Sequence, residues 1–189
     1  PGVFFVMRQS RLIPTILLNN GGVYKTVQFK SPRYIGAPIN IIRLFNQHEV
    51  DELILLDTHC SKERKSPDFR FLKDLATEAF VPLSYGGGVS SLEIARRILN
   101  IGFEKLVLNT AALDNPSLLQ DLIKEFGSAS VVVSLDYKKT VLGKRKLYRH
   151  SLGKATDVDL FKAVKNTEEV GVGEILINSV DLDGSMLGM

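Results

Sequence analysis

The strongest constraint on the fold is the alternation of short apolar runs with amphipathic segments along the chain. Runs rich in Val, Ile and Leu suit strands that are buried on both faces, as in parallel sheets. Between them, apolar residues recur at the spacing of a helix with one buried face. Repeated βα units of this kind predict a parallel sheet with right-handed crossovers. The apolar runs are RLIPTILL (11–18), ELILLD (52–57), VPLSY (81–85), KLVLN (105–109), VVVSLD (131–136) and EILINS (174–179).

The segments between these runs carry signals for the start of helices. Ser90–Glu93 has the pattern of a capping box, in which a hydroxyl and a carboxylate satisfy free amides of the first turn. Ser66-Pro67 and Asn115-Pro116 each place a capping side chain before a proline at the first helical position. We therefore expect a helix after each of these points. The amphipathic patterns lie at 41–48, 72–79 and 118–126.

Units of this size build either a doubly wound sheet or a (β/α)₈ barrel of about 250 residues. Six strands in 189 residues would complete a doubly wound sheet, whereas a barrel would still lack two of its eight units. The segment 50–59 resembles 172–184, which is typical of two similar halves of one barrel. We therefore expect one incomplete barrel domain, residues 1–189, truncated after the sixth strand. Such an open arc would expose strand edges and favour association. The segment 138–153 reads as an inserted hairpin.

Composition excludes several classes of function. Lys and Arg exceed Asp and Glu by only 24 to 21, too little to indicate a nucleic-acid partner. The single cysteine, Cys60, rules out an internal disulfide and fits a reduced, cytoplasmic setting. His48, His59 and His150 do not cluster, so we expect packing or surface roles for them and no metal or cofactor. No apolar stretch approaches the length of a membrane span, and we expect no membrane partner.

Polar residues that follow the apolar runs mark the expected functional face, because sites in such folds lie at the carboxyl ends of strands. The amides of Gly86-Gly87-Gly88 precede a helix and can cradle an anion, although a plain turn also explains the glycines. Asn109 and Thr110 end the neighbouring strand and can add donors to the same phosphate. Asp136 ends a wholly apolar strand, where it can serve as a general acid or base or only anchor the next loop. Other polar residues at this face are Asp57, Ser84, Ser179, Asp181 and Asp183, of which Asp57 and Asp181 can equally be capping residues.

A second set of residues lies where the strands begin. Arg11, Glu52, Lys105 and Glu174 each start an apolar run, so a barrel would bring them into one ring of alternating charges. Charge inside a barrel is costly unless it is paired, so mutual ion pairs are expected. From the residues alone, a stabilising role is the main expectation for this face.

Taken together, these segments resemble the cyclase subunit family of imidazole glycerol phosphate synthase, a (β/α)₈ barrel of histidine biosynthesis. The resemblance runs from Arg11 to the end of the chain. It is most specific in LNTAALDNPSL and GEILINSVDLDG, and is also carried by RLIPTILL, YKTVQF, DELILLD, YGGGVSSLEIA and EFGSASVVVSLD.

The resemblance implies a partner and a set of roles. In this family a separate glutaminase docks at the bottom of the barrel, and its ammonia passes through the barrel to a substrate with two phosphates. By motif, Asp136 would be the catalytic carboxylate and Lys25 the lysine of a mobile first loop. Gly87, Gly88, Asn109 and Thr110 would hold one phosphate, and Asp183 and Gly184 would lie near the second. Arg11, Glu52, Lys105 and Glu174 would form the gate through which ammonia enters.

One residue departs from the family pattern. Leu17 stands where the family has a catalytic aspartate on the first strand, and leucine cannot transfer a proton. This combination resembles a paralogous branch associated with surface-polysaccharide synthesis, in which an acetamido group of a sugar becomes an acetamidino group. A phosphorylated or nucleotide-linked sugar-type substrate is therefore expected. A genuine histidine-pathway cyclase and a non-catalytic, ammonia-conducting scaffold remain alternatives, and a related phosphosugar isomerase is disfavoured by the same Leu17.

Overall fold

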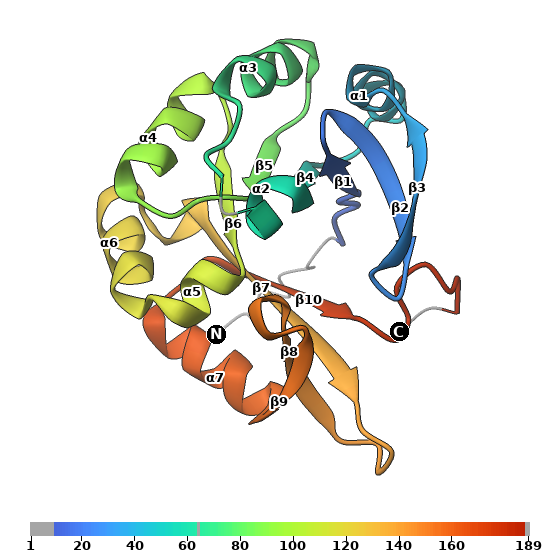
Figure 1. The fold of residues 1–189 in the computed structure, drawn as a ribbon. Coiled ribbons are helices and arrows are strands. Elements are labelled where there is room, and N and C mark those ends of the chain that lie inside the picture. The colour runs from blue at the N-terminus through green and yellow to red at the C-terminus, as the bar shows by residue number, and fades with distance from the viewer. Residues whose placement is uncertain (1–9, 64, 188–189) are drawn as a thin grey trace, which may run out of the picture.

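The computed structural model describes residues 10–63 and 65–187, and shows a curved sheet with helices along its outer side (Figure 1). Each of the six apolar runs contributes one strand to a parallel ladder, so the predicted α/β alternation is confirmed. In spatial order the parallel strands are β1 (Thr15–Asn19), β4 (Leu53–Asp57), β5 (Leu83–Gly86), β6 (Lys105–Leu108), β7 (Val131–Lys139) and β10 (Glu174–Ser179). Among the described residues, no ladder joins β1 to β10.

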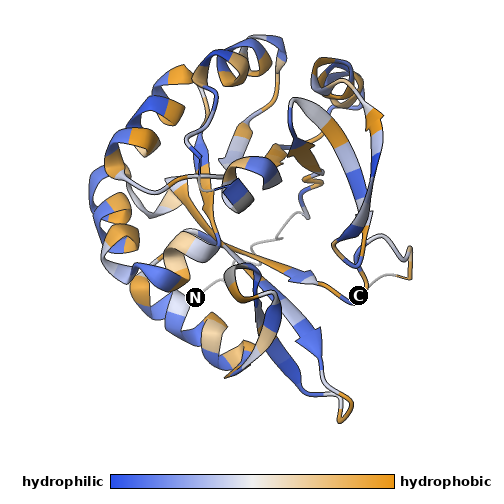
Figure 2. Ribbon diagram, viewed as in Figure 1, coloured by the Kyte–Doolittle hydropathy of each residue, from blue (hydrophilic) through white to orange (hydrophobic). Residues whose placement is uncertain are grey.

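The helices pack their apolar faces against the outer side of the sheet (Figure 2). Two short helices, α2 (Thr58–Glu63) and α5 (Thr110–Asp114), directly follow β4 and β6. No helix in the described ranges is long and apolar enough to cross a membrane. The longer helices are α1 (Pro38–Gln47), α3 (Phe69–Glu78), α4 (Leu92–Ile101), α6 (Pro116–Phe126) and α7 (Leu160–Val170).

Two of the predicted helix starts are shifted along the chain. Asn115 caps α6 as expected, by accepting a hydrogen bond from the Leu118 amide. The cap of α3 is Asp68 rather than Ser66, because one oxygen of its carboxylate accepts from two amides of the first turn. The cap of α4 is Ser91 rather than Ser90, and its hydroxyl accepts from the Ile94 amide.

Alternate residues of each parallel strand belong to two different apolar layers. Leu53 and Leu55 of β4 pack in the large outer core beneath the helices. Ile54, between them, joins a smaller cluster on the inner face of the sheet with Val107 and Val132. Burial on both faces is the reason that these strands are continuous apolar runs and do not alternate with polar residues.

Antiparallel strands extend both ends of the parallel ladder. On one side, β2 (Gly22–Val27) and β3 (Lys30–Gly36) form a hairpin that pairs with β1. On the other, β8 (Arg145–Arg149) pairs with β7, which confirms the hairpin predicted within 138–153. A further strand, β9 (Lys154–Asp159), pairs with β8 and was not expected from the sequence. Both additions begin at the carboxyl ends of parallel strands, where they flank the candidate site.

Candidate functional site

Four charged side chains meet at the end of the sheet where the parallel strands begin. Lys105 Nζ lies 2.6 Å from Glu52 Oε2 and 3.0 Å from Glu174 Oε1. The Arg11 guanidinium lies 2.6 Å from Glu174 Oε1 and 3.4 Å from Glu52 Oε2. The structure thus brings together all four residues that the sequence placed at strand starts, with positive and negative charges alternating around a closed ring.

Burial is uneven within this ring. Glu52 is only 2% exposed and accepts a further, short hydrogen bond from the Ser84 hydroxyl. Burial by itself would raise the pKa of Glu174, but hydrogen bonds from Lys105 and Arg11 outweigh it and lower that pKa. Burial opposes the charge of Lys105, yet the two glutamates raise the pKa of Lys105 overall. Glu174 also raises the pKa of Arg11, chiefly through its hydrogen bond, so Arg11, Lys105 and Glu174 are charged at neutral pH.

A cavity with mainly apolar walls adjoins the ring. An open cavity of about 330 Å³ is lined by Arg11 and Glu174 at its charged mouth. Most of its remaining walls belong to the inner apolar cluster, and Ile175 of β10 packs against the outer core. These apolar walls are Ile13, Ile54, Val132, Ile175 and Leu176.

At the opposite end of the strands, Asp136 forms the centre of a hydrogen-bonded group. Asp136 is 5% exposed, and the Asn109 amide donates to its Oδ2 at 2.7 Å. His150 Nε2 lies 2.9 Å from the same oxygen. A buried carboxylate that is held by an amide and bonded to a partly exposed imidazole can take part in proton transfer.

His150 joins this group although the sequence predicts only a packing or surface role for it. The return strand β8 carries His150 back over the end of β7, because Tyr137 and Leu147 are partners in the antiparallel register. Phe29, in the turn between β2 and β3, packs on the imidazole with ring centroids 5.1 Å apart, and Tyr148 packs on its edge at 5.3 Å. The only signal in the sequence was a histidine at the far end of an insertion that begins just after Asp136.

The glycine-rich turn and the Asn109–Thr110 pair lie at neighbouring strand ends, since Gly86 and Val107 are partners in the β5–β6 register. Both amide hydrogens of Asn109 are used within the protein, on Asp136 and on the Ser134 carbonyl at 3.0 Å. The expected side-chain donation from Asn109 to a phosphate therefore has no free hydrogen. The Thr110 hydroxyl itself donates to Asn109 Oδ1 at 3.5 Å, so the backbone amides are the main donors left for an anion. Gly87, with a φ of 139°, lies against Asp57, where a Cβ would come within 2.6 Å of its carbonyl oxygen.

Asp57 faces the helices rather than the inner face of the sheet. Its Oδ1 accepts from the Cys60 amide at 2.9 Å, so it acts as a capping residue for α2. Its Oδ2 lies 3.4 Å from the Tyr85 hydroxyl. Burial and the nearby Asp57 carboxylate raise the pKa of Cys60 to about 12 and also raise the pKa of Tyr85. The geometry favours the capping alternative for Asp57.

The loop after β10 fastens the β2–β3 hairpin. Asp183 Oδ2 accepts from the Thr26 hydroxyl at 2.7 Å and from the Phe29 amide at 2.9 Å. Gly184 lies so close to the Thr26 carbonyl that a side chain there would overlap it. Asp181 accepts from the Lys139 amide at 2.7 Å. Of the other top-face candidates, Lys25 is exposed on β2 and Ser179 is buried, with no partner for its hydroxyl in the described part of the chain.

Leu17 occupies an inward position near the carboxyl end of β1. Its register partner is Leu56, which packs against the inner apolar cluster. Inward positions near the carboxyl ends of β7 and β10 are polar, with Asp136 on β7 and its register partner Asn178 on β10. Within the ranges that the structure describes, no cluster of His, Cys, Asp and Glu could hold a metal ion.

Comparisons with known proteins agree with the geometry. The family model described as "Histidine biosynthesis protein" matches residues 11–189. A relative from Leptospira interrogans is 45% identical over 183 residues, which cover 96% of this chain and 72% of the relative. Its provisional name is imidazole glycerol phosphate synthase subunit HisF. Relatives with the corresponding provisional names hisF2, from Pseudomonas aeruginosa, and hisF3, from Vibrio vulnificus, are 43% and 40% identical and are covered over 72% and 70% of their lengths.

Proposed function

The chain belongs to the histidine biosynthesis protein family, and from this premise we propose that it is a cyclase-type subunit of a glutamine amidotransferase complex. It receives ammonia from a separate glutaminase at the charged ring and delivers it to a substrate held near Asp136. The substrate is a phosphorylated or nucleotide-linked sugar-type molecule.

The observation that carries this proposal is the paired ring of Arg11, Glu52, Lys105 and Glu174 in front of an apolar cavity. Ammonia is small and uncharged, so it can pass an apolar layer that rejects ions and disfavours water. The ring presents fixed charges to a docking partner at one end of the strands. Asp136 and His150 offer proton transfer at the other end. This separation supports a division between an ammonia entrance and a reaction site.

Leu17 supports the narrower proposal that the substrate differs from that of histidine synthesis. With an aliphatic side chain at this inward position, the strand lacks the second carboxylate of the family's acid–base pair. We propose the branch in which an acetamido group on a sugar becomes an acetamidino group. The alternatives are a genuine cyclase that forms imidazole glycerol phosphate, and a scaffold that conducts ammonia while the partner does the chemistry.

The test uses this protein together with its glutaminase partner, supplied with either glutamine or an ammonium salt. Two substrates are compared: the open-chain bisphosphate intermediate of the histidine pathway and a nucleotide-linked acetamido sugar. We expect turnover of the sugar. Turnover of the bisphosphate by the wild type at the rate of an ordinary cyclase would instead assign the chain to histidine synthesis. The Leu17→Asp variant, which restores a carboxylate on the first strand, should turn over the bisphosphate faster than the wild type.

The ammonia route is tested separately with Lys105→Met. We expect the ratio of glutamine-driven to ammonium-driven turnover to fall, because ammonia released by the partner is no longer admitted efficiently. Arg43→Met is the matched control, since Arg43 pairs with Glu78 at 2.8 Å on the outer helices. An equal ratio in the wild type and in both variants would contradict the ammonia route.

A further inference from the structure

Positive charge is concentrated in one segment of the chain. Residues 137–156, which include the end of β7 and all of β8, contain seven of the 24 Lys and Arg residues and no Asp or Glu. All 21 acidic residues therefore lie in the rest of the chain, which has a net negative charge although the whole has +3. Such separation gives the molecule one basic region that attracts anionic surfaces and a body that is repelled by them.

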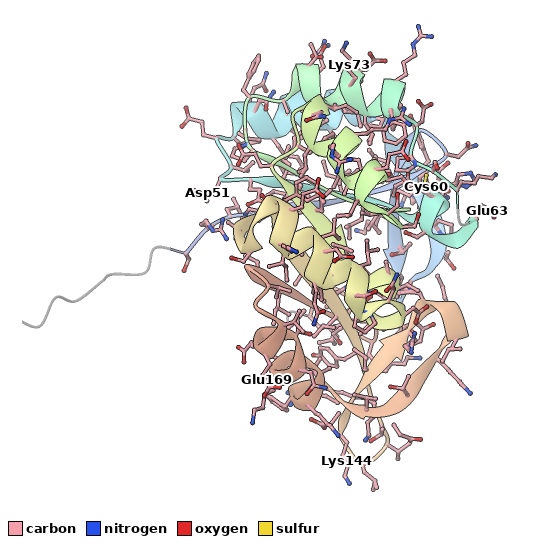
Figure 3. All side chains as sticks on the ribbon, turned by 90° about the vertical axis from the view of Figure 1, so that its left-hand side faces the viewer. Asp51, Cys60, Glu63, Lys73, Lys144 and Glu169 are labelled. Atoms are coloured by element: carbon pink, nitrogen blue, oxygen red, sulfur yellow. The ribbon has the colours of Figure 1, made fainter. Side chains whose placement is uncertain are left out.

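The basic segment projects from the body on a well-defined turn (Figure 1). The Thr140 amide donates to the Lys144 carbonyl at 2.9 Å, and the Gly143 amide donates to the Thr140 carbonyl at 2.9 Å. Gly143 has a φ of 76°, which glycine adopts readily. Lys144 lies at the end of the molecule opposite Lys73 (Figure 3). The hairpin tip is therefore held in shape and is accessible to a large partner.

Two aliphatic side chains form the tip of this hairpin. Val141 is fully exposed and Leu142 is 85% exposed, between arms that carry Lys139, Lys144 and Arg145 (Figure 2). Neither side chain has a neighbour that shields it from water, so both gain free energy from entering an apolar phase. An apolar tip with basic flanks matches the boundary between acyl chains and anionic headgroups.

We propose that the β7–β8 hairpin attaches this protein to the surface of an anionic phospholipid bilayer, with Val141 and Leu142 below the headgroups and the basic arms among the phosphates. This proposal replaces the expectation that the protein has no membrane partner. Adsorption at the surface needs only the tip and does not need a spanning helix, of which the described residues contain none. A nucleic-acid partner is disfavoured, since the tip offers aliphatic rather than aromatic side chains for base stacking. The tip also lies away from the ring that is proposed to receive the glutaminase.

The experiment measures binding of the whole protein to vesicles of equal parts phosphatidylglycerol and phosphatidylcholine, and to vesicles of phosphatidylcholine alone. We expect binding only to the anionic vesicles, and weaker binding as salt is added. Each basic residue near such a surface contributes roughly fivefold in affinity, so Lys144→Gln with Arg145→Gln should weaken binding about 25-fold. Val141→Ser with Leu142→Ser should weaken it about tenfold or more at constant charge.

Matched controls alter the same residue types at the far end of the molecule. Lys73→Gln removes a basic side chain from α3, and Phe80→Ser removes an 87% exposed apolar side chain just beyond it. Both should bind like the wild type, and thermal melting shows that every variant is folded. The proposal is wrong if neutral and anionic vesicles bind equally, or if the tip variants bind as the controls do. It is also wrong if two results occur together. These are tighter binding to a single-stranded oligonucleotide than to the anionic vesicles, and oligonucleotide binding that is the same for the tip variants as for the wild type.

Discussion

His150 Nε2 and Asp136 Oδ2 are 2.9 Å apart, although Asp136 lies on β7 and His150 directly follows the end of β8. Asn109 donates to the same oxygen, so the carboxylate is fixed between an amide and an imidazole. Because the imidazole is bonded to Asp136 through Nε2, Nδ1 is the nitrogen left to exchange a proton with a substrate. Asp136 and His150 can thus supply acid–base chemistry at this end of the sheet, where β1 offers the aliphatic side chain of Leu17 and no proton-transferring group.

Substitution of Asp136 by Asn should lower ammonium-driven turnover by about 10²- to 10⁴-fold, which is the usual range for loss of a general acid or base. The amide keeps the shape of the side chain but cannot accept a proton or stabilise an imidazolium. Steady-state kinetics with saturating ammonium measure the effect. Undiminished coupled turnover would support the scaffold alternative and exclude Asp136 as a catalytic residue.

Substitution of His150 by Gln should also lower kcat, and it should change the pH profile of kcat/KM because one ionising group is removed. Asp136 and Tyr148 contact His150, and the preceding residue, Arg149, pairs with Asp114. His48→Gln is the control, since His48 is exposed at the end of α1. If both variants share the wild-type profile, His150 has only a packing role against Phe29.

Removal of Glu52 should destabilise the fold strongly. Glu52→Ala leaves Lys105 without its closest partner at a largely buried position, and loss of one member of a buried pair typically costs about 3–5 kcal/mol. The double variant Glu52→Leu with Lys105→Met replaces both charges and should recover most of that loss. Urea denaturation measures the free energy of unfolding. A double variant less stable than the single variant would show that the ring has a larger structural role than its pairing implies.

Acid should weaken the same ring through Glu174. Hydrogen bonds from Lys105 and Arg11 lower the pKa of Glu174 in the folded state. The ionised Glu174 therefore stabilises the fold at any pH above the ordinary carboxyl pKa. This stabilisation is lost as the pH falls through the lowered pKa of the folded state. Glu174→Gln should therefore lose less stability between neutral and acidic pH than the wild type. Glu169→Gln, which alters an exposed carboxylate on α7, should follow the wild-type curve. Chemical denaturation at a series of pH values makes the comparison.

The parallel strands and the charged ring could be predicted because both follow from local sequence. Apolar runs that are buried on two faces identify strands without knowledge of their partners. Four of the six runs begin with a charged residue, and the parallel ladder brings these four charges to the same end of the sheet. The pairing of Arg11 with Glu174 also needs the curvature expected of a barrel, because no ladder among the described residues joins β1 to β10.

The arrangement around Asp136 could not be predicted in the same way. His150 reaches Asp136 only because β8 pairs with β7 in a particular register, and that register depends on the length of the turn at Thr140–Gly143. The use of both Asn109 hydrogens within the protein likewise depends on atomic distances. Asp57 was placed at the correct strand end, but the alternation of side chains along β4 turns it toward the helices.

Cys60 should be almost unreactive in the folded protein at neutral pH. Burial, and then the neighbouring Asp57 carboxylate, raise the pKa of its thiol to about 12 from an ordinary value of 9.0, so the thiolate population falls about a thousandfold. The side chain is also only 6% exposed, which restricts access of a reagent. A disulfide reagent at mildly alkaline pH should therefore label the folded protein at least a thousandfold more slowly than the urea-unfolded protein. Asp57→Asn should increase the rate in the folded state, because it removes the repelling charge. Equal rates for folded and unfolded protein would mean that the α2 segment opens faster than the reagent attacks.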